Sequence, residues 1–114
     1  MSDRTAAVAL DLDHKREAVA AVCRRLGVQR LDLFGSATTA SFDPARSDLD
    51  FLVEFDQNDR HLFRRYFDLK ETLEGLFGRQ VDLVSAGSLS NPYMVESVER
   101  TRLTIYAAKD AQAA

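Results

Sequence analysis

Three aspartates and a Gly-Ser pair have the types and the spacing that phosphate chemistry requires. Gly35 and Ser36 end one apolar run of the chain, Asp48 and Asp50 begin the next, and Asp82 lies within a third. On a β-strand, residues two apart project to the same side, so the first two carboxylates repel each other unless a cation lies between them. Magnesium prefers oxygen ligands and usually combines one or two carboxylates with the phosphates of its substrate. The paired aspartates therefore predict a magnesium site.

The Gly-Ser pair supplies the complementary half of such a site. A glycine lets the backbone approach a phosphate closely, and a serine hydroxyl and neighbouring N–H groups can donate hydrogen bonds to phosphate oxygens. Asp82 adds a third carboxylate if its strand lies beside that of Asp50. There it could hold a second magnesium ion or accept the proton of an attacking hydroxyl. Together these residues predict a nucleoside triphosphate bound as its metal complex, and phosphoryl or nucleotidyl transfer as the chemistry.

Length and composition define the setting of this site. The chain has 114 residues, 46% of them hydrophobic and 29% charged, with a net charge of −3. These values predict one folded domain and give no electrostatic reason to expect a nucleic-acid or membrane partner. The one cysteine, Cys23, is expected to pack in the core. Because the chain has no signal-like start and no apolar run long enough for a membrane span, we expect a cytoplasmic protein.

Changes in hydrophobic periodicity divide the chain into helices and strands. Helices are expected at residues 13–26, 59–77 and 92–100, and strands at residues 28–34, 49–55, 80–84 and 103–107. This order predicts an α/β (α+β) domain in which helices cover a small mixed sheet. The domain is expected to span residues 1–114, with its core at about 12–107 and a frayed tail at 108–114.

The second expected helix carries an aromatic stripe. It consists of Phe63, Tyr66, Phe67 and Phe77, which fall on or beside the apolar face of that helix. Such a stripe is typical of a core or of a partner interface. We therefore expect these rings to pack inside the domain or against another protein.

The ordered residues also resemble a known family. The segment "LFGS" is followed, after eleven residues, by "DLD" and an apolar strand, and beyond a helix by "VDLV". This order is similar to that of the minimal nucleotidyltransferases, small stand-alone members of the DNA polymerase β-like superfamily that include the MNT-type antitoxins. The resemblance covers nearly the whole chain and implies a nucleotidyltransferase fold like the polymerase β palm. It implies that Gly35 and Ser36 hold the triphosphate and that Asp48, Asp50 and Asp82 are the catalytic and metal-binding acids.

The resemblance further implies a reaction and a partner. MNT-type antitoxins transfer AMP from ATP to a tyrosine of a HEPN toxin, a ribonuclease, and so block it. For this chain, the resemblance implies an adenylyltransferase that uses ATP and magnesium, with two ions expected, and that pairs with a HEPN toxin. No direct binding of nucleic acid is expected.

One stretch departs from the family pattern. Members commonly carry an Ala-Arg-Gly run just after the Gly-Ser turn, whereas Thr39 and Ala40 stand where the arginine and glycine are usual. Loss of this arginine would weaken triphosphate binding. Arg46 lies directly before Ser47 and Asp48, so we expect Arg46 to substitute for it and expect both Arg46 and Ser47 to bind nucleotide.

Two other functions stay open at this point. A degenerate nucleotidyltransferase could neutralise its partner by binding alone, and the missing arginine favours this alternative. The intact acids favour the enzyme. A third alternative is an adenylyltransferase that modifies a small antibiotic.

Overall fold

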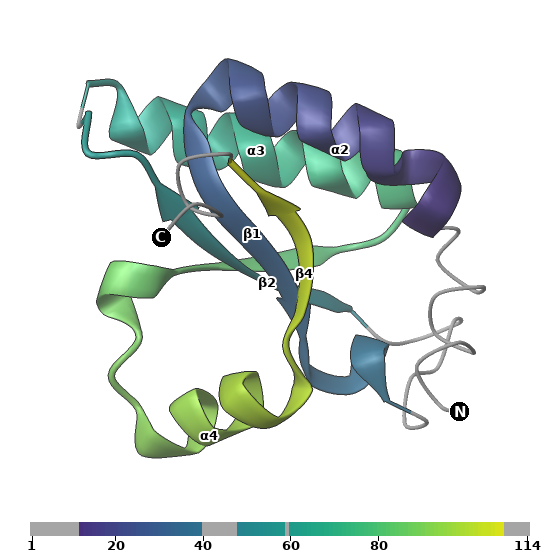
Figure 1. Ribbon diagram of the computed structural model, residues 1–114, viewed down its shortest axis with the longest axis vertical. Coiled ribbons are helices and arrows are strands. Elements are labelled where there is room, and N and C mark those ends of the chain that lie inside the picture. The colour runs from purple at the N-terminus through teal and green to yellow at the C-terminus, as the bar shows by residue number, and fades with distance from the viewer. Residues whose placement is uncertain (1–11, 40–47, 59, 109–114) are drawn as a thin grey trace.

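The computed structural model describes residues 12–39, 48–58 and 60–108. In chain order these residues form α2 (Leu12–Leu26), β1 (Val28–Phe34), the short 3-10 helix η1 (Gly35–Thr38), β2 (Leu49–Phe55), α3 (Leu62–Phe77), β3 (Val81–Ser85), η2 (Ala86–Ser88), α4 (Pro92–Thr101) and β4 (Leu103–Ala107) (Figure 1). Every helix and strand expected from the sequence lies within these elements or overlaps them.

The start of α3 differs most from the prediction. The helix begins at Leu62 rather than near residue 59. The side chain of Asp56 accepts the N–H of Asn58, and the side chain of Asn58 accepts the N–H of Arg60, which holds this stretch in turns instead of a helix. His61 then adopts a left-handed conformation, with φ of 55°, directly before the first helical residue.

The four strands form one mixed sheet in the order β3-β2-β1-β4. β1 pairs in antiparallel fashion with β2 and β4, whereas β2 and β3 are parallel. Antiparallel neighbours can be joined by short turns, but the parallel pair needs a crossover, and α3 supplies it. The expected fold class, a small mixed sheet covered by helices, is confirmed.

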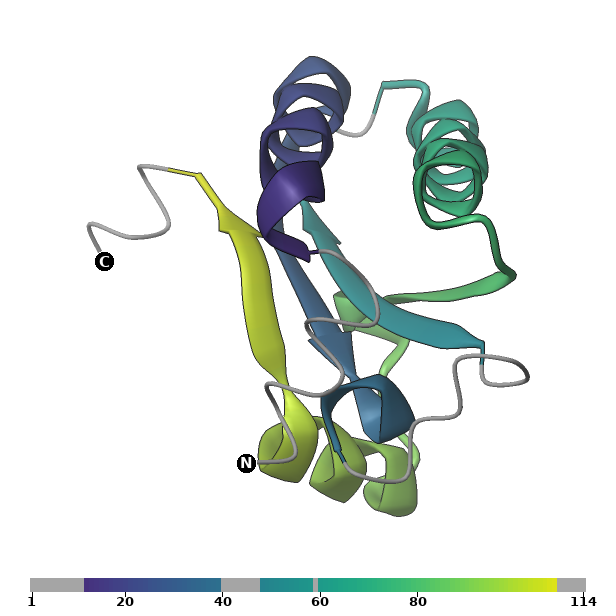
Figure 2. The ribbon, with the colours of Figure 1, turned by 90° about the vertical axis from the view of Figure 1, so that its right-hand side faces the viewer.

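Helices α2 and α3 lie side by side on one face of the sheet, and α4 lies on the other (Figures 1 and 2). The main core fills the space beneath the first pair. Its members include Val19, Val22, Cys23 and Leu26 of α2, Leu69, Leu73 and Phe77 of α3, and Leu31, Leu33, Leu49, Phe51, Val53, Val81 and Leu83 of the sheet. The prediction that Cys23 packs in this core is confirmed, and burial raises the pKa of its thiol to about 12.

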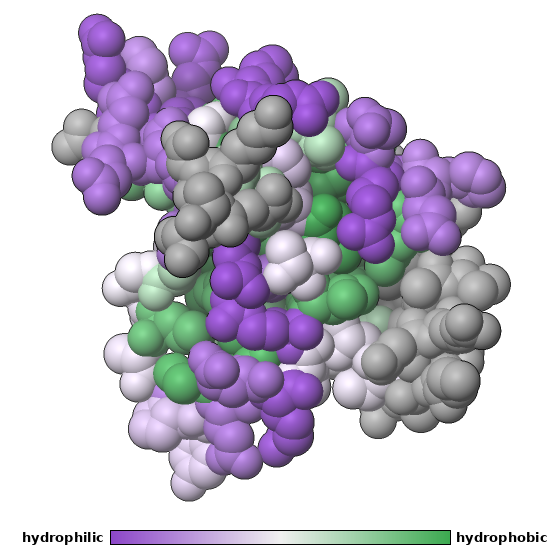
Figure 3. Space-filling model, in the orientation of Figure 1, coloured by the Kyte–Doolittle hydropathy of each residue, from purple (hydrophilic) through white to green (hydrophobic). Residues whose placement is uncertain are grey.

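The opposite face of the sheet has a much smaller apolar cluster. Phe34, Leu52 and Val98 are buried there, with Val84, Leu89 and Met94 among the half-buried residues around them. Figure 3 shows hydrophilic side chains over the upper helices and over the lower part of the molecule, with apolar side chains gathered between them. This face is therefore only partly covered, and polar groups on it can reach solvent.

The aromatic stripe of α3 divides between the core and the surface. Phe77 is buried and Tyr66 is half-buried, where its hydroxyl donates to the carbonyl of Leu83. Phe63 and Phe67 are exposed, and their ring centroids lie 4.7 Å apart. No helix in the described part of the chain combines the length and the apolar character needed to cross a membrane.

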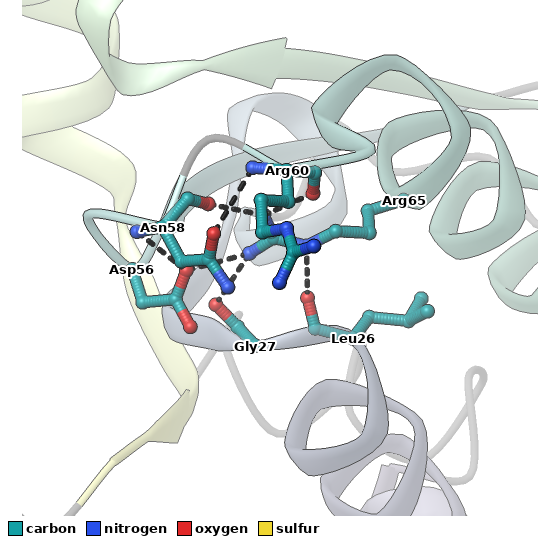
Figure 4. A network of polar contacts seen from close by, with 6 residues as sticks. All are labelled: Leu26, Gly27, Asp56, Asn58, Arg60 and Arg65. Atoms are coloured by element: carbon teal, nitrogen blue, oxygen red, sulfur yellow. Dashed lines mark hydrogen bonds and ion pairs between the residues drawn. The ribbon is translucent and has the colours of Figure 1, made fainter.

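Arg65 holds together the end of the sheet and the two covering helices (Figure 4). Its guanidinium donates to the carbonyls of Leu26 (2.7 Å), Gly27 (3.2 Å) and Asn58 (2.5 Å), and to the carboxylate of Asp56 (2.7 Å). Its side chain is only 12% exposed. A planar guanidinium satisfies several acceptors at once, which a lysine ammonium in the same place cannot do.

Arg65→Lys is expected to lower the free energy of unfolding by about 2 kcal/mol, because several half-buried acceptors lose their donors while the charge is kept. Chemical denaturation measures this loss. Arg64→Lys is the matched control, since Arg64 is the exposed neighbour on the same helix. Equal stability of the two variants would show that the network in Figure 4 contributes little.

Candidate active site

The sheet register brings the predicted carboxylates together. Asp50 pairs with Asp82 across the parallel β2–β3 ladder, and with Phe34 across the antiparallel ladder to β1. Paired residues project to the same side of a sheet, and Leu49 and Phe51 point into the main core. Asp50 and Asp82 therefore lie on the opposite, partly covered face.

Two hydrogen bonds donated by backbone N–H groups fix the ends of β2 and β3 that carry these acids. The N–H of Leu49 donates to the carbonyl of Gln80 at 3.1 Å, which places the start of β2 beside the start of β3. The N–H of Val81 donates to the carboxylate of Glu74 on α3 at 3.1 Å. Asp48 directly precedes β2 and is exposed. The three aspartates thus lie at one edge of the sheet, with solvent access.

Gly35 brings the Gly-Ser turn against Asp50. A Cβ on Gly35 would lie 2.6 Å from Oδ2 of Asp50, and Gly35 has a φ of +77°. Both facts require glycine at this position, because a side chain would meet the carboxylate and strain the backbone. The turn expected to bind phosphates and the acid expected to bind metal are therefore in direct proximity.

The electrostatics of Asp50 show that the acids repel one another. The pKa of Asp50 is raised from its ordinary value of 3.8 to about 6, first by burial and then by the charges of Asp82 and Asp48. A carboxyl group with a raised pKa beside two other acids is typical of a functional site. A divalent cation between them would remove the repulsion.

The available oxygen donors fit a magnesium ion that takes some of its ligands from the substrate. Within the described residues, no three His, Cys, Asp or Glu side chains are grouped as a metal site formed by protein alone. Magnesium seldom needs such a cage, since carboxylates and substrate phosphates together supply its oxygen ligands. Asp48 and Asp50, with Asp82 nearby, fit this partial role.

Threonine side chains hold the Gly-Ser turn in shape. The hydroxyl of Thr38 donates to the carbonyl of Gly35, and that of Thr39 donates to the carbonyl of Ser36, both at 3.1 Å. The N–H of Gly35 donates to the hydroxyl of Thr101 on α4 at 2.8 Å. Thus the turn is fixed both by its own residues and by the end of a distant helix.

An open cavity of about 320 Å³ lies beside the turn. Its lining residues are Gly35, Ser36, Thr39, Ser97, Arg100 and Thr101. Ser97, Arg100 and Thr101 were not predicted as site residues, because nothing in the sequence places α4 next to the Gly-Ser turn. The helical spacing of these residues, which puts them on one face of α4, is their only local signal.

Of the other predicted residues, Arg46 and Ser47 lie outside the described residues, as does Ala40. Their role in nucleotide binding stays a prediction. Gly35, Ser36, Asp48, Asp50 and Asp82 are all described and lie at one edge of the sheet.

A buried ion-pair network, also absent from the sequence predictions, lies on the same face. Asp32 of β1 is fully buried and accepts hydrogen bonds from Arg30 at 3.1 Å and from Arg102 at 2.9 and 2.5 Å. Arg102 follows Thr101 directly, so two successive residues fix the junction of α4 and β4 against β1 and the turn. A buried carboxylate held by two arginines is satisfied, which indicates a structural role.

Comparison with known proteins identifies the family of the chain. Residues 15–105 match the family described as nucleotidyltransferase domain. A protein of Methanocaldococcus jannaschii, MJ1379, named as a candidate protein adenylyltransferase, is 40% identical over 72 residues, which cover 63% of this chain and 71% of the relative.

Solved structures share the fold. One of a candidate minimal nucleotidyltransferase has a TM-score of 0.67 at 39% identity, covering 83% of this chain and 93% of the other. A complex of a tri-AMPylated HEPN toxin of Shewanella oneidensis with its MNT antitoxin has a TM-score of 0.58 at 19% identity, covering 90% of this chain and 77% of that one. The second likeness is one of fold alone.

The family match spans most of the chain, including the Gly-Ser turn and all three acids. The chain therefore belongs to the nucleotidyltransferase domain family and is a nucleotidyltransferase.

Proposed function

We propose that this nucleotidyltransferase is an MNT-type antitoxin that transfers AMP from ATP to a tyrosine of a partner HEPN toxin and so neutralises it. The sheet register carries the proposal, because it sets Asp50 beside Asp82 and against Gly35. The proposal is also supported by the relative named as a candidate protein adenylyltransferase, and by the fold shared with the complex of a HEPN toxin and its MNT antitoxin. All helices and strands of the described residues belong to the fold that bears the site, and in this proposal the acceptor docks on the open face of that fold.

In this proposal each group has a defined task. Gly35 and Ser36 hold the triphosphate, and Asp48 and Asp50 hold magnesium, with Asp82 as ligand of a second ion or as the base. Bound magnesium would neutralise charge on the phosphate oxygens during transfer. The tyrosine oxygen forms a bond to the α-phosphorus, the bond from that phosphorus to the bridging oxygen of the β-phosphate breaks, and pyrophosphate leaves. The hydroxyl proton passes to Asp82 or to water.

A binding-only antitoxin is the second candidate, and Thr39 is the observation that favours it. Thr39 replaces the usual phosphate-binding arginine, and its hydroxyl is bonded within the turn. Occlusion of the toxin would need the fold but none of the acids. The two candidates therefore differ in what they require of Asp82.

The double variant Asp48→Asn/Asp50→Asn is expected to lose binding of ATP in magnesium, because the remaining oxygens cannot replace two charged ligands. Calorimetry with and without magnesium measures this. Glu54→Gln is the control, since Glu54 is an exposed acid on the same face of β2. If the double variant bound as tightly as the wild type, the metal site would lie elsewhere.

Asp50→Asn alone is expected to stabilise the metal-free protein at pH 7 by about 1–2 kcal/mol, after discounting for the partial exposure of the side chain. The pKa of Asp50 is raised in the fold to about 6, so its proton stabilises the wild type below pH 3.8 and this contribution is lost as the pH rises to 6. The advantage of the variant should therefore grow between pH 4 and pH 6 and then stay constant.

Denaturation at a series of pH values measures this difference. Glu54→Gln serves as the comparison, because Glu54 is an exposed acid of β2 that does not contribute to the raised pKa of Asp50. A wild type that is more stable than Asp50→Asn at pH 7 without metal would contradict the repulsion inferred for the three acids.

Asp82→Asn is expected to reduce AMP transfer by about 100-fold or more, while the fold and toxin binding persist, because Asp82 is exposed and the shape is kept. The toxin is incubated with ATP, magnesium and either variant, and its intact mass is read for added AMP. Glu54→Gln should transfer like the wild type. A toxin that stays unmodified yet is neutralised equally by wild type and Asp82→Asn would establish the binding-only antitoxin instead.

A further inference from the structure

We infer that Arg100, on the last turn of α4, supplies the positive charge to the triphosphate that Thr39 cannot supply. This assignment rests on the proposed function, since it names a further residue for binding of the same nucleotide. The expectation that Arg46 compensates for Thr39 stays a separate prediction, because Arg46 lies outside the described residues.

The cavity beside the Gly-Ser turn places Arg100 correctly for this task. Gly35, Ser36 and Thr39 line it from the turn, and Arg100 lines it from α4 (Figure 2 shows α4 next to η1). Among the described residues that line this cavity, Arg100 is the only charged one. Arg100 therefore forms part of the wall of the pocket in which the turn would present its hydrogen-bond donors.

The last turn of α4 is held firmly against the phosphate turn. The hydroxyl of Thr101 accepts the N–H of Gly35 at 2.8 Å and donates to the carbonyl of Ser97 at 2.6 Å. Arg102 bonds the buried carboxylate of Asp32. Because Arg100 lies between Ser97 and Arg102 in the chain, its backbone position relative to Gly35 is fixed, and only its side chain has to move.

The charges around the cavity create a need for a cation. The carboxylate of Asp50 adjoins Gly35, and the carbonyl end of α4 contributes partial negative charge at the other wall. Magnesium held by Asp50 would neutralise the first of these charges, whereas the end of α4 would still present negative charge to a bound triphosphate. An arginine that donates two parallel hydrogen bonds is suited to neutralise it.

Arg100 is available for this role at little cost. Its present partner is Glu96, one turn earlier on α4, at 3.2 Å, and the two side chains are 67% and 70% exposed. Exposed ion pairs of this kind contribute little to stability. The guanidinium can therefore exchange Glu96 for a phosphate without disturbing the helix.

The test is calorimetric binding of magnesium AMP-PNP to the full chain. Arg100→Gln is expected to weaken binding by about tenfold or more, the range for loss of one charge-assisted hydrogen bond. Arg64→Gln is the matched control, because it removes the same charge from an exposed position of α3, on the other side of the sheet, and should change affinity by less than about twofold. Adding Thr39→Arg to Arg100→Gln should recover affinity, since residue 39 lines the same cavity.

The outcomes separate this assignment from the proposed function. If the wild type does not bind magnesium AMP-PNP, the proposed function and the assignment both fail. If the wild type binds and Arg100→Gln binds equally well, the assignment alone is overturned. If Arg100→Gln and Arg64→Gln weaken binding to the same extent, the effect is one of overall charge, which also overturns it. Thermal melting of each variant checks that the fold is kept.

Discussion

The site depends on the close approach of Asp50 to Gly35. A side chain at residue 35 would lie 2.6 Å from the Asp50 carboxylate, and the positive φ of Gly35 already disfavours any other residue. The antiparallel pairing of β1 with β2 brings these two residues together, because it sets Phe34 opposite Asp50, although eleven residues of sequence separate Ser36 from Asp48. The register of the sheet then adds Asp82 from β3. Glycine at this point is thus what allows a turn suited to phosphates and acids suited to metal to share one edge.

Grouping three acids in this way lowers the stability of the protein, and the fold keeps these acids away from its main core. The large core lies between the sheet and the helices α2 and α3, on the face away from the acids. The face that carries the acids holds only a small apolar cluster and a satisfied ion-pair network around Asp32. Repulsion at Asp50 therefore acts on the face with the smaller apolar cluster, away from the main core. Separation of stabilising and functional surfaces is common in enzymes, whose sites are often strained relative to the rest of the fold.

The sequence predicted those parts of the structure that depend on local patterns. Alternation in β2 and the three- and four-residue spacing in α2 and α3 were sufficient to locate these elements, since burial of one face dictates that periodicity. The start of α3 was misplaced, because side-chain hydrogen bonds of Asp56 and Asn58 override helix propensity there. Arg100 and Thr101 of the cavity, and the buried Asp32, could not be predicted. Each depends on the packing of α4 and β4 against β1, which joins residues about seventy positions apart.

The contact of α4 with the Gly-Ser turn affects which substitutions can change activity while the fold is kept. The Gly-Ser turn is anchored to Thr101, so its geometry depends on the contact between α4 and η1 as much as on its own residues. Thr38 and Thr39 close the turn with hydroxyls, and they do so without the arginine that family members commonly place at residue 39. The shape of the turn and the charge it offers to a phosphate are therefore separate properties of this chain. A substitution that removes the charge leaves the shape, and a cation from any element packed against the turn can restore the charge. In this molecule that element is α4.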